Sequence, residues 1–253
     1  MIGYVLYFVL GLIIGTLAAL FGLGGGFLIV PLLNISGVEI HQAIGTSSAA
    51  IVFTSLSSAI AYARQRRIRY KIGALITGTA IFGAYIGAYL TSFVDPGPLK
   101  VIFGAVLTFV ALRMFISAER HSKGEEKTKE MKLWTAPLIG VLSGVASGFL
   151  GIGGGIVIVP SLTYLGIPIH YAVATSSFCI VFTSISSALK HYTMGNVLVH
   201  WLIFLVPGLI IGAQLGPRIA KRMKSKTLKR AFSIVMGVLA LRMILKGLGF
   251  PVP

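Results

Sequence analysis

Apolar residues fill eight long stretches of the chain, and short polar or charged segments separate them. The long stretches run near residues 2–21, 41–63, 72–93, 99–116, 134–150, 170–189, 198–219 and 227–246. Most of them reach the roughly 17 to 25 residues that a helix needs to cross the apolar core of a bilayer. Two shorter apolar pieces, 26–36 and 155–166, follow clusters of glycine and are marginal as independent spans. The pattern predicts an all-α polytopic membrane protein.

The chain contains the same unit twice. Residues 22–31 recur as residues 151–160, at a shift of 129 (151 − 22 = 129). At this shift, residues 11–116 align with residues 140–245 without gaps. A duplicated unit folds into two similar halves, and transporters built from such repeats bind their substrates where the halves meet. We therefore expect the function to reside between the repeats.

Basic residues are distributed unequally between equivalent loops of the two halves. The loop over residues 64–71 holds five Lys or Arg residues, whereas its counterpart after Leu189 holds only Lys190. The next loop, around Asp95, holds one, but the matching stretch 218–230 holds seven. Because Lys and Arg favour cytoplasmic loops, equivalent loops face opposite sides of the membrane. The repeats are therefore expected to be inverted, which requires an odd number of crossings in each.

These charges predict a multi-pass protein of the cytoplasmic (inner) membrane, with both termini outside. We expect an inverted repeat of about five segments over residues 1–116, a cytoplasmic polar linker over 117–133 and a second repeat over 134–253. Either eight full spans plus two short or re-entrant segments, or ten spans, fit this topology. The short segment 26–36 favours the first count, because about 11 residues rise only about 17 Å as a helix.

Composition excludes several classes of protein. With 56% hydrophobic and 11% charged residues and a mean hydropathy of +0.92, the chain is far more apolar than a soluble domain. The net charge of +16 is explained by cytoplasmic loops, so no nucleic-acid partner is expected. The single cysteine, Cys179, excludes an internal disulfide and a cysteine-based metal cluster, and we expect no metal and no cofactor. Nucleotide-binding and intramembrane catalytic motifs are lacking, which argues against an ATP-driven pump and against an enzyme.

Two glycine clusters interrupt the apolar pattern at equivalent positions, and each is followed five residues later by a proline. A helix that begins after such a cluster presents free N–H groups and its positive end to an anion. The alternative is a tight turn or close helix packing. We select the clusters as candidate substrate-binding residues: Gly24, Gly25, Gly26, Gly153, Gly154 and Gly155.

Hydroxyl side chains open the third apolar segment of each half. We expect them at helix N-termini, where they would contact an oxyanion: Thr46, Ser47, Ser48, Thr175, Ser176 and Ser177. Hydroxyls further along, such as Thr54 and Ser55, are expected to bond neighbouring helices or their own i−4 carbonyls. His41 and His170 precede the hydroxyls by about one turn and are candidates to donate to an anion or to hold a proton. Capping of a helix is the alternative for both.

Further glycines recur at every fourth residue in several of the apolar segments. Gly83 and Gly87 return as Gly212 and Gly216, and Gly140 begins a run at intervals of four. Small residues at this spacing let membrane helices approach closely. We interpret these glycines as helix-packing positions.

The doubled Gly-rich loop followed by Pro31 or Pro160, with the downstream Thr-Ser-Ser, resembles the TauE/SafE family of membrane transporters, the sulfite exporters and their relatives. The resemblance covers nearly the whole chain except the linker. It implies a secondary transporter that exports a small sulfur-containing anion such as sulfite, sulfoacetate or a related organosulfonate. The residues themselves indicate only a small oxyanion.

We expect alternating access, with the anion bound between the two repeats. An anion channel or a membrane subunit of a larger complex is the alternative. Partners are the lipid bilayer, the anion and a coupling ion, either H⁺ or Na⁺. The lack of Asp and Glu in mid-span argues against a carboxylate-based proton relay. Coupling through histidine, coupling to Na⁺, or uncoupled flow of the anion then remain.

Overall fold

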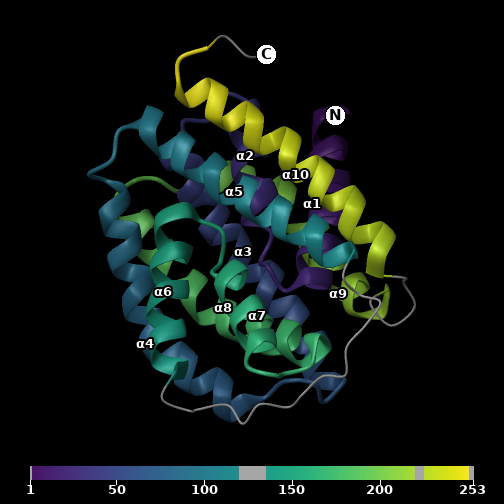
Figure 1. Cartoon of the computed structure of the whole chain (residues 1–253). Coiled ribbons are helices and arrows are strands. Elements are labelled where there is room, and N and C mark those ends of the chain that lie inside the picture. The colour runs from purple at the N-terminus through teal and green to yellow at the C-terminus, as the bar shows by residue number, and fades with distance from the viewer. Residues whose placement is uncertain (1, 120–134, 220–224, 251–253) are drawn as a thin grey trace.

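The computed structural model describes residues 2–119, 135–219 and 225–250. Most of the predicted linker 117–133 therefore lies outside the described residues. Ten helices make up the described part of the chain, five in each half (Figure 1). They are α1 (Ile2–Phe21), α2 (Gly26–Ile35), α3 (Ile40–Arg64), α4 (Tyr70–Thr91), α5 (Pro96–Glu119), α6 (Thr135–Leu150), α7 (Gly155–Tyr164), α8 (Ile169–Thr193), α9 (Val199–Ile219) and α10 (Ser225–Gly247).

The helices repeat in the same order and at nearly the same bounds after the shift of 129 residues. The start of α2 at Gly26 corresponds to the start of α7 at Gly155, and Ile40 of α3 corresponds to Ile169 of α8. In these described residues, five helices are long and apolar enough to cross a membrane, namely α3, α4, α5, α8 and α9. The chain is therefore an all-helical polytopic membrane protein, as its apolar pattern predicts.

The short helix α2 forms a hairpin with α1. Gly25 holds φ at +101°, a left-handed conformation that suits glycine and lets the chain reverse after α1. Ten residues of helix rise about 15 Å, half of the roughly 30 Å that a span requires. The Tyr7 hydroxyl of α1 lies 3.1 Å from the Ser36 hydroxyl, just beyond the end of α2. The hairpin thus enters and leaves at one end of the molecule, and α2 matches the short or re-entrant segment of the eight-span count.

The remaining helices of the first half run to and fro between two ends of the molecule. In Figure 1, α1 begins and α10 ends in the upper part of the molecule, and α4 begins at its lower end and rises along the left side. His41 Nε2 lies within hydrogen-bond distance of the carbonyl oxygens of Thr91 and Val94, which joins the start of α3 to the end of α4. At the other end, Gln65 Nε2 donates to the Pro217 carbonyl at 3.5 Å. The basic loop 64–71 therefore lies beside the end of α9.

Equivalent helices of the two halves pack in opposite directions. The Ser187 hydroxyl, near the end of α8, donates to the Ser48 hydroxyl, near the start of α3, at 3.0 Å. In the same way, the end of α10 at Gly247 packs against Gly97 and Val101 at the start of α5. This antiparallel relation is the one that an inverted repeat requires.

Glycines at intervals of four bring helices of different halves into backbone contact. A Cβ atom placed on Gly87 of α4 would lie 2.9 Å from Val145 Cα of α6. A Cβ atom on Gly212 of α9 would lie 2.8 Å from the Thr16 nitrogen of α1. Both distances are shorter than real Cβ contacts, so only glycine permits this spacing. The predicted packing role of these glycines is confirmed.

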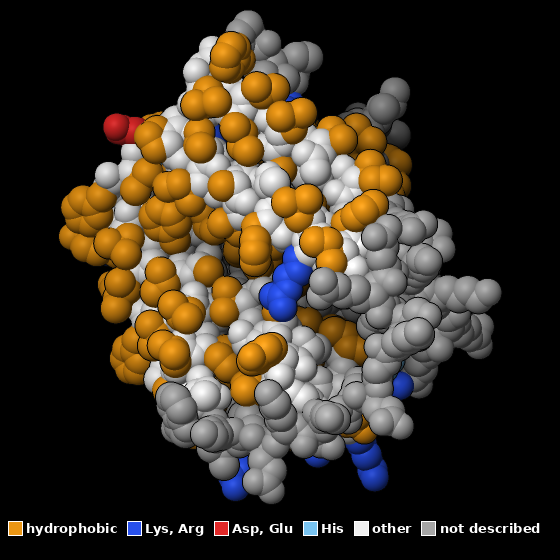
Figure 2. Space-filling model, viewed as in Figure 1, with side chains coloured by type: hydrophobic (Ala, Val, Ile, Leu, Met, Phe, Trp, Pro, Cys, Tyr) orange, Lys and Arg blue, Asp and Glu red, His pale blue; other side chains and the backbone are white. Residues whose placement is uncertain are grey.

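Large apolar side chains cover much of the outer surface. Phe82 is 72% exposed, and Ile203 and Val238 are each 64% exposed. Figure 2 shows hydrophobic side chains across much of the visible face, with several Lys and Arg at its lower edge and one near its middle. The apolar part of this exterior matches the hydrocarbon of a bilayer.

Candidate functional site

The two glycine clusters meet at the centre of the molecule. A Cβ atom on Gly24 would lie 3.3 Å from the Ile152 carbonyl oxygen, and one on Gly153 would lie 3.5 Å from Gly24 Cα. Both positions also lie against Ile51 and Ile180, which are equivalent residues near the middle of α3 and α8. The predicted meeting of the repeats at their glycine loops is therefore present in the fold.

Two serine hydroxyls join each half to the glycine loop of the other. Ser47 Oγ donates to the Gly151 carbonyl at 2.8 Å, and Ser176 Oγ donates to the Gly22 carbonyl at 2.8 Å. The two bonds are equivalent under the shift of 129 residues. Reciprocal contacts of this kind are those of a two-fold relation between the halves.

The threonines of the same motif cap helices of the opposite half. The Leu198 N–H donates to Thr46 Oγ1 at 2.9 Å, just before α9. The Arg69 N–H donates to Thr175 Oγ1 at 3.0 Å, just before α4. Each threonine thus satisfies a backbone donor at a helix N-terminus.

The expectation that the Thr-Ser-Ser motif starts its helix is wrong. Helix α3 begins at Ile40, six residues before Thr46, because Glu39 has an extended backbone and Ile40 is fully buried in the core. The N–H groups of Thr46, Ser47 and Ser48 therefore lie inside the helix, where the i−4 carbonyls engage them. Only the side chains of the motif remain as potential ligands, and the same holds for its copy in α8.

The remaining hydroxyls of α3 and α8 bond to protein acceptors. Ser177 Oγ donates to its own i−4 carbonyl, that of Val173, at 3.0 Å. Thr54 Oγ1 donates to the Ala50 carbonyl and Ser55 Oγ to the Ile51 carbonyl, also at i−4. The predicted bonding of the distal hydroxyls is confirmed.

The positive ends of α2 and α7 both face the centre. Gly25 and Gly154 are the N-cap residues, both in the left-handed conformation, and no described side chain caps either helix. The first N–H groups of an α-helix have no intrahelical acceptor and carry a partial positive charge. The centre thus combines two helix N-termini from opposite halves with the hydroxyls of Ser47 and Ser176.

Side chains of this centre are closed off from solvent. Thr46, Ser47, Thr175 and Ser176 are each 0% exposed. The conformation is therefore one in which the glycine loops and both central serines are sealed between the repeats.

The two candidate histidines lie away from this centre and differ from each other. His41 Nδ1 lies 2.7 Å from the Glu39 carboxylate, and its other ring nitrogen faces the end of α4. His170 is exposed at the start of α8. The structure thus gives His41 a structural contact at the upper end. A third histidine, His191, is fully buried, and its only sequence signal is that it replaces Tyr62 of the first repeat.

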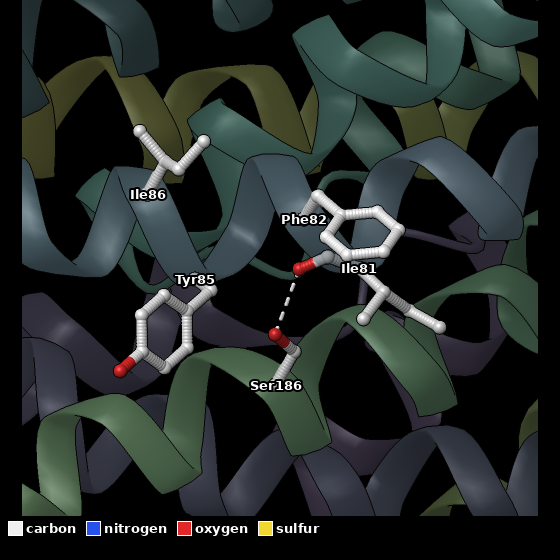
Figure 3. Close-up of a pocket in the computed structure, with 5 residues that line it drawn as sticks. All are labelled: Ile81, Phe82, Tyr85, Ile86 and Ser186. Carbon is white, nitrogen blue, oxygen red and sulfur yellow. Dashed lines mark hydrogen bonds between the residues drawn. The ribbon is translucent and has the colours of Figure 1, made fainter.

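A separate groove of about 350 Å³ lies between α4 and α8. It is lined by four apolar or aromatic residues of α4 and by Ser186, whose hydroxyl donates to the Ile81 carbonyl (Figure 3). No candidate residue from the sequence lines it. The groove is mostly apolar, and the Ser186 hydroxyl is engaged by a backbone carbonyl, so it offers few donors to an anion.

Comparisons with known proteins agree with this architecture. The family model described as sulfite exporter TauE/SafE matches residues 7–243. The probable membrane transporter protein YunE of Bacillus subtilis is 33% identical, over 97% of this chain and 98% of its own length. A probable membrane transporter protein of Methanocaldococcus jannaschii is 32% identical over 95% of both chains, and YdhB of Bacillus subtilis is 31% identical over 94% of this chain and 97% of its own. No solved structure matches.

The relatives are named as transporters and not as enzymes, which agrees with a membrane transport role. The chain is a multi-pass membrane transporter and belongs to the sulfite exporter TauE/SafE family.

Proposed function

We propose that this protein is a secondary transporter that exports a small sulfur-containing oxyanion across the cytoplasmic membrane. Sulfite, which the description of the family names, is one proposed substrate, and sulfoacetate and related organosulfonates are the others. The upper end in Figure 1 faces the outside and the lower end, with the basic loop 64–71, faces the cytoplasm. The anion binds between the repeats, at the glycine loops and the two central serines.

The observation that carries the proposal is the reciprocal pair of bonds from Ser47 to Gly151 and from Ser176 to Gly22. Each bond ties a hydroxyl of one half to the loop that precedes a helix N-terminus of the other half. When the loops separate, each hydroxyl exchanges a carbonyl acceptor for an oxygen atom of the anion. The N–H groups at the starts of α2 and α7 supply further donors without a fixed cation.

This arrangement supports alternating access. When the halves separate at one end of the molecule, one of the two serine bonds breaks. Because the halves are related by a two-fold axis, the other serine bond breaks when they separate at the opposite end. The anion then replaces the broken bond and is released when the second end opens. The centre is 0% exposed at both serines, as expected of the occluded state that a carrier passes through between its two open states.

Binding measurements on alanine variants test the site. Ser47→Ala and Ser176→Ala each remove one donor to a charged ligand, which is worth about 1.5–3 kcal/mol, or roughly 10- to 150-fold in Kd. Titration calorimetry with sulfite and sulfoacetate on the purified protein measures this loss. Flux of the labelled anion into proteoliposomes measures its effect on transport.

Ser57→Ala and Ser186→Ala are matched controls. Both serines also donate to the carbonyl of a neighbouring helix at 2.8 Å, that of Ile210 or Ile81, but neither contacts a glycine loop. Ser186→Ala removes one hydrogen bond of similar geometry, and Ser57→Ala removes such a bond together with the one that Gln214 Nε2 donates to the Ser57 hydroxyl at 3.0 Å. Both controls should leave anion affinity unchanged. The site is wrong if both central variants bind as tightly as the wild type, or if the controls weaken binding to the same extent.

A further inference from the structure

The two halves differ at one buried contact between the first helix of each repeat and the end of its third helix. In the first half, the Tyr62 hydroxyl of α3 donates to the Ala19 carbonyl of α1 at 2.8 Å. In the second half, the equivalent contact joins His191 Nε2 of α8 to the Gly148 carbonyl of α6 at 3.0 Å. The residue shift is the same for both partners (191 − 62 = 129 and 148 − 19 = 129). A tyrosine on one side is therefore replaced by a titratable imidazole on the other.

At this contact, the second half holds two buried polar atoms that have no partner within the described residues. His191 is 0% exposed, and its Nδ1 has no hydrogen-bond partner among the described residues. Ser147, one residue before the carbonyl that His191 contacts, is 1% exposed, and within the same described part its hydroxyl also lacks a partner. In the first half, Ala18 stands where Ser147 stands, so that contact carries no unsatisfied polar atom. A buried polar atom without a partner costs about 1–3 kcal/mol, which points to a role other than stability.

The charges around His191 leave a protonated imidazole without a counter-ion. Helix α6 contributes no titratable side chain, and α3 contributes His41, which is already paired with Glu39 at 2.7 Å. Lys190, the preceding residue of α8, holds its ammonium group 4.7 Å from the centre of the Tyr89 ring of α4 and 5.3 Å from that of Tyr85. Of these neighbours, Lys190 is a cation, His41 becomes one when protonated, and Tyr85 and Tyr89 are aromatic. In the absence of an added anion, they do not stabilise a second proton on His191.

The contact of His191 lies on the turn that leads into the central site. Gly148 is three residues before Gly151, and the Gly151 N–H donates to the Ser147 carbonyl at 2.9 Å. Gly151 in turn accepts the hydrogen bond of Ser47. His191 is thereby connected through one helical turn of α6 to the glycine loop of the proposed anion site.

We propose that His191 takes up a proton together with the transported anion, so that H⁺ is the coupling ion. The proton binds to Nδ1, and the negative charge of the anion compensates for the charge of the imidazolium. Because binding free energies are reciprocal, the anion favours protonation as much as protonation favours the anion. The inference rests on the proposed anion site and identifies how transport there is coupled.

The pH dependence of anion binding tests this coupling. Sulfoacetate is the probe, because both of its acid groups stay ionised between pH 6 and 8.5. Titration calorimetry on the purified full chain gives Kd at each pH. If one proton binds with the anion, Kd for the wild type rises up to about tenfold for each unit of rising pH once His191 is deprotonated in the free protein. Calorimetry in buffers of different ionisation enthalpy counts the protons taken up.

His191→Tyr restores the residue of the first repeat and removes the titratable ring. This variant should bind sulfoacetate with a Kd that does not change with pH and should take up no protons. His191→Gln is the second variant, in case the larger ring does not fit. His200→Tyr, at an exposed histidine near the same end, is the matched control and should keep the wild-type pH dependence.

The outcomes separate the coupling from the anion site itself. Wild-type binding that is independent of pH, or a His191→Gln variant that keeps the wild-type pH dependence, overturns the coupling and leaves the site intact. Failure of the wild type to bind sulfoacetate at any pH removes the basis of both proposals.

Discussion

Alanine at Gly26 or Gly155 should destabilise the protein by pushing the two glycine loops apart. A Cβ atom on Gly26 would overlap the Gly151 carbonyl and lie 2.7 Å from Ile152 Cα and 2.8 Å from Ile51 Cδ1. Ordinary contact begins at 3.4 Å, so Ile152 Cα would have to move by about 0.7 Å (3.4 − 2.7) and the Gly151 carbonyl oxygen by more. A backbone atom cannot rotate out of the way as a side chain can. The strain therefore falls on the contact between the repeats.

The expected magnitude follows from two contributions. Overpacking of a well-packed interior costs about 1–3 kcal/mol. Displacement of the Gly151 carbonyl also weakens its bond from Ser47, which contributes about 1 kcal/mol. We expect Gly26→Ala to lower the free energy of unfolding by about 2–4 kcal/mol. Gly155→Ala acts on the equivalent contact, where a Cβ would lie 2.8 Å from Leu23 Cα, and the double variant should be less than additive because the two sites share one contact.

Denaturant unfolding in detergent, followed by circular dichroism, measures these changes. Gly78→Ala is the matched control, because Gly78 also lies in a helix but a Cβ there would meet no atom within 4 Å. The control should be neutral or more stable by up to about 1 kcal/mol, from the higher helix propensity of alanine. Gly26→Ala and Gly155→Ala variants as stable as Gly78→Ala would refute close contact between the loops.

Two further predictions concern the histidines and the orientation. His41→Gln should lower the free energy of unfolding by about 1–2 kcal/mol, because it loses the contacts to Glu39 and to the end of α4. His170→Gln, at an exposed position, should change the free energy of unfolding by less than about 0.5 kcal/mol. Thermal unfolding of the two variants in parallel measures the difference, and equal stabilities would contradict the prediction. Cysteine introduced at the exposed Lys71 should react with an impermeant maleimide only from the cytoplasmic side, and cysteine at the exposed Ser92 only from outside. The native Cys179 is buried and should not react. The reverse labelling pattern would overturn the orientation.

The helices and their duplication could be predicted because both depend on local signals. Apolar length identifies the spans, and the recurrence of the glycine clusters identifies the break before each short helix. The separation of α2 from α1 follows from glycines that adopt positive φ, a property of the residue itself. The basic loops predict that the repeats are inverted, and the antiparallel packing of α3 and α8 agrees with that prediction.

The chemistry of the centre was harder to predict because it depends on distant partners. Thr46 accepts from the N–H of Leu198, 152 residues later and just before α9, and the burial of Ile40 moves the start of α3 ahead of the motif. His41 and His170 occupy equivalent positions, yet Glu39 stands two residues before the first and Pro168 two residues before the second. Within the described residues, a carboxylate partner is found for His41 alone. His191 was missed because nothing local distinguishes it. Its signal is the mismatch with Tyr62 in the aligned repeat, which a comparison of the halves residue by residue would reveal.

The location of a bound anion tests the central proposal most directly. Selenite, the selenium analogue of sulfite, can be diffused into crystals of the protein and located by the anomalous scattering of selenium. We predict one selenium peak between the two glycine loops, within hydrogen-bonding reach of Ser47 or Ser176. A peak elsewhere, such as in the groove between α4 and α8, with none at the loops, would contradict the proposed site.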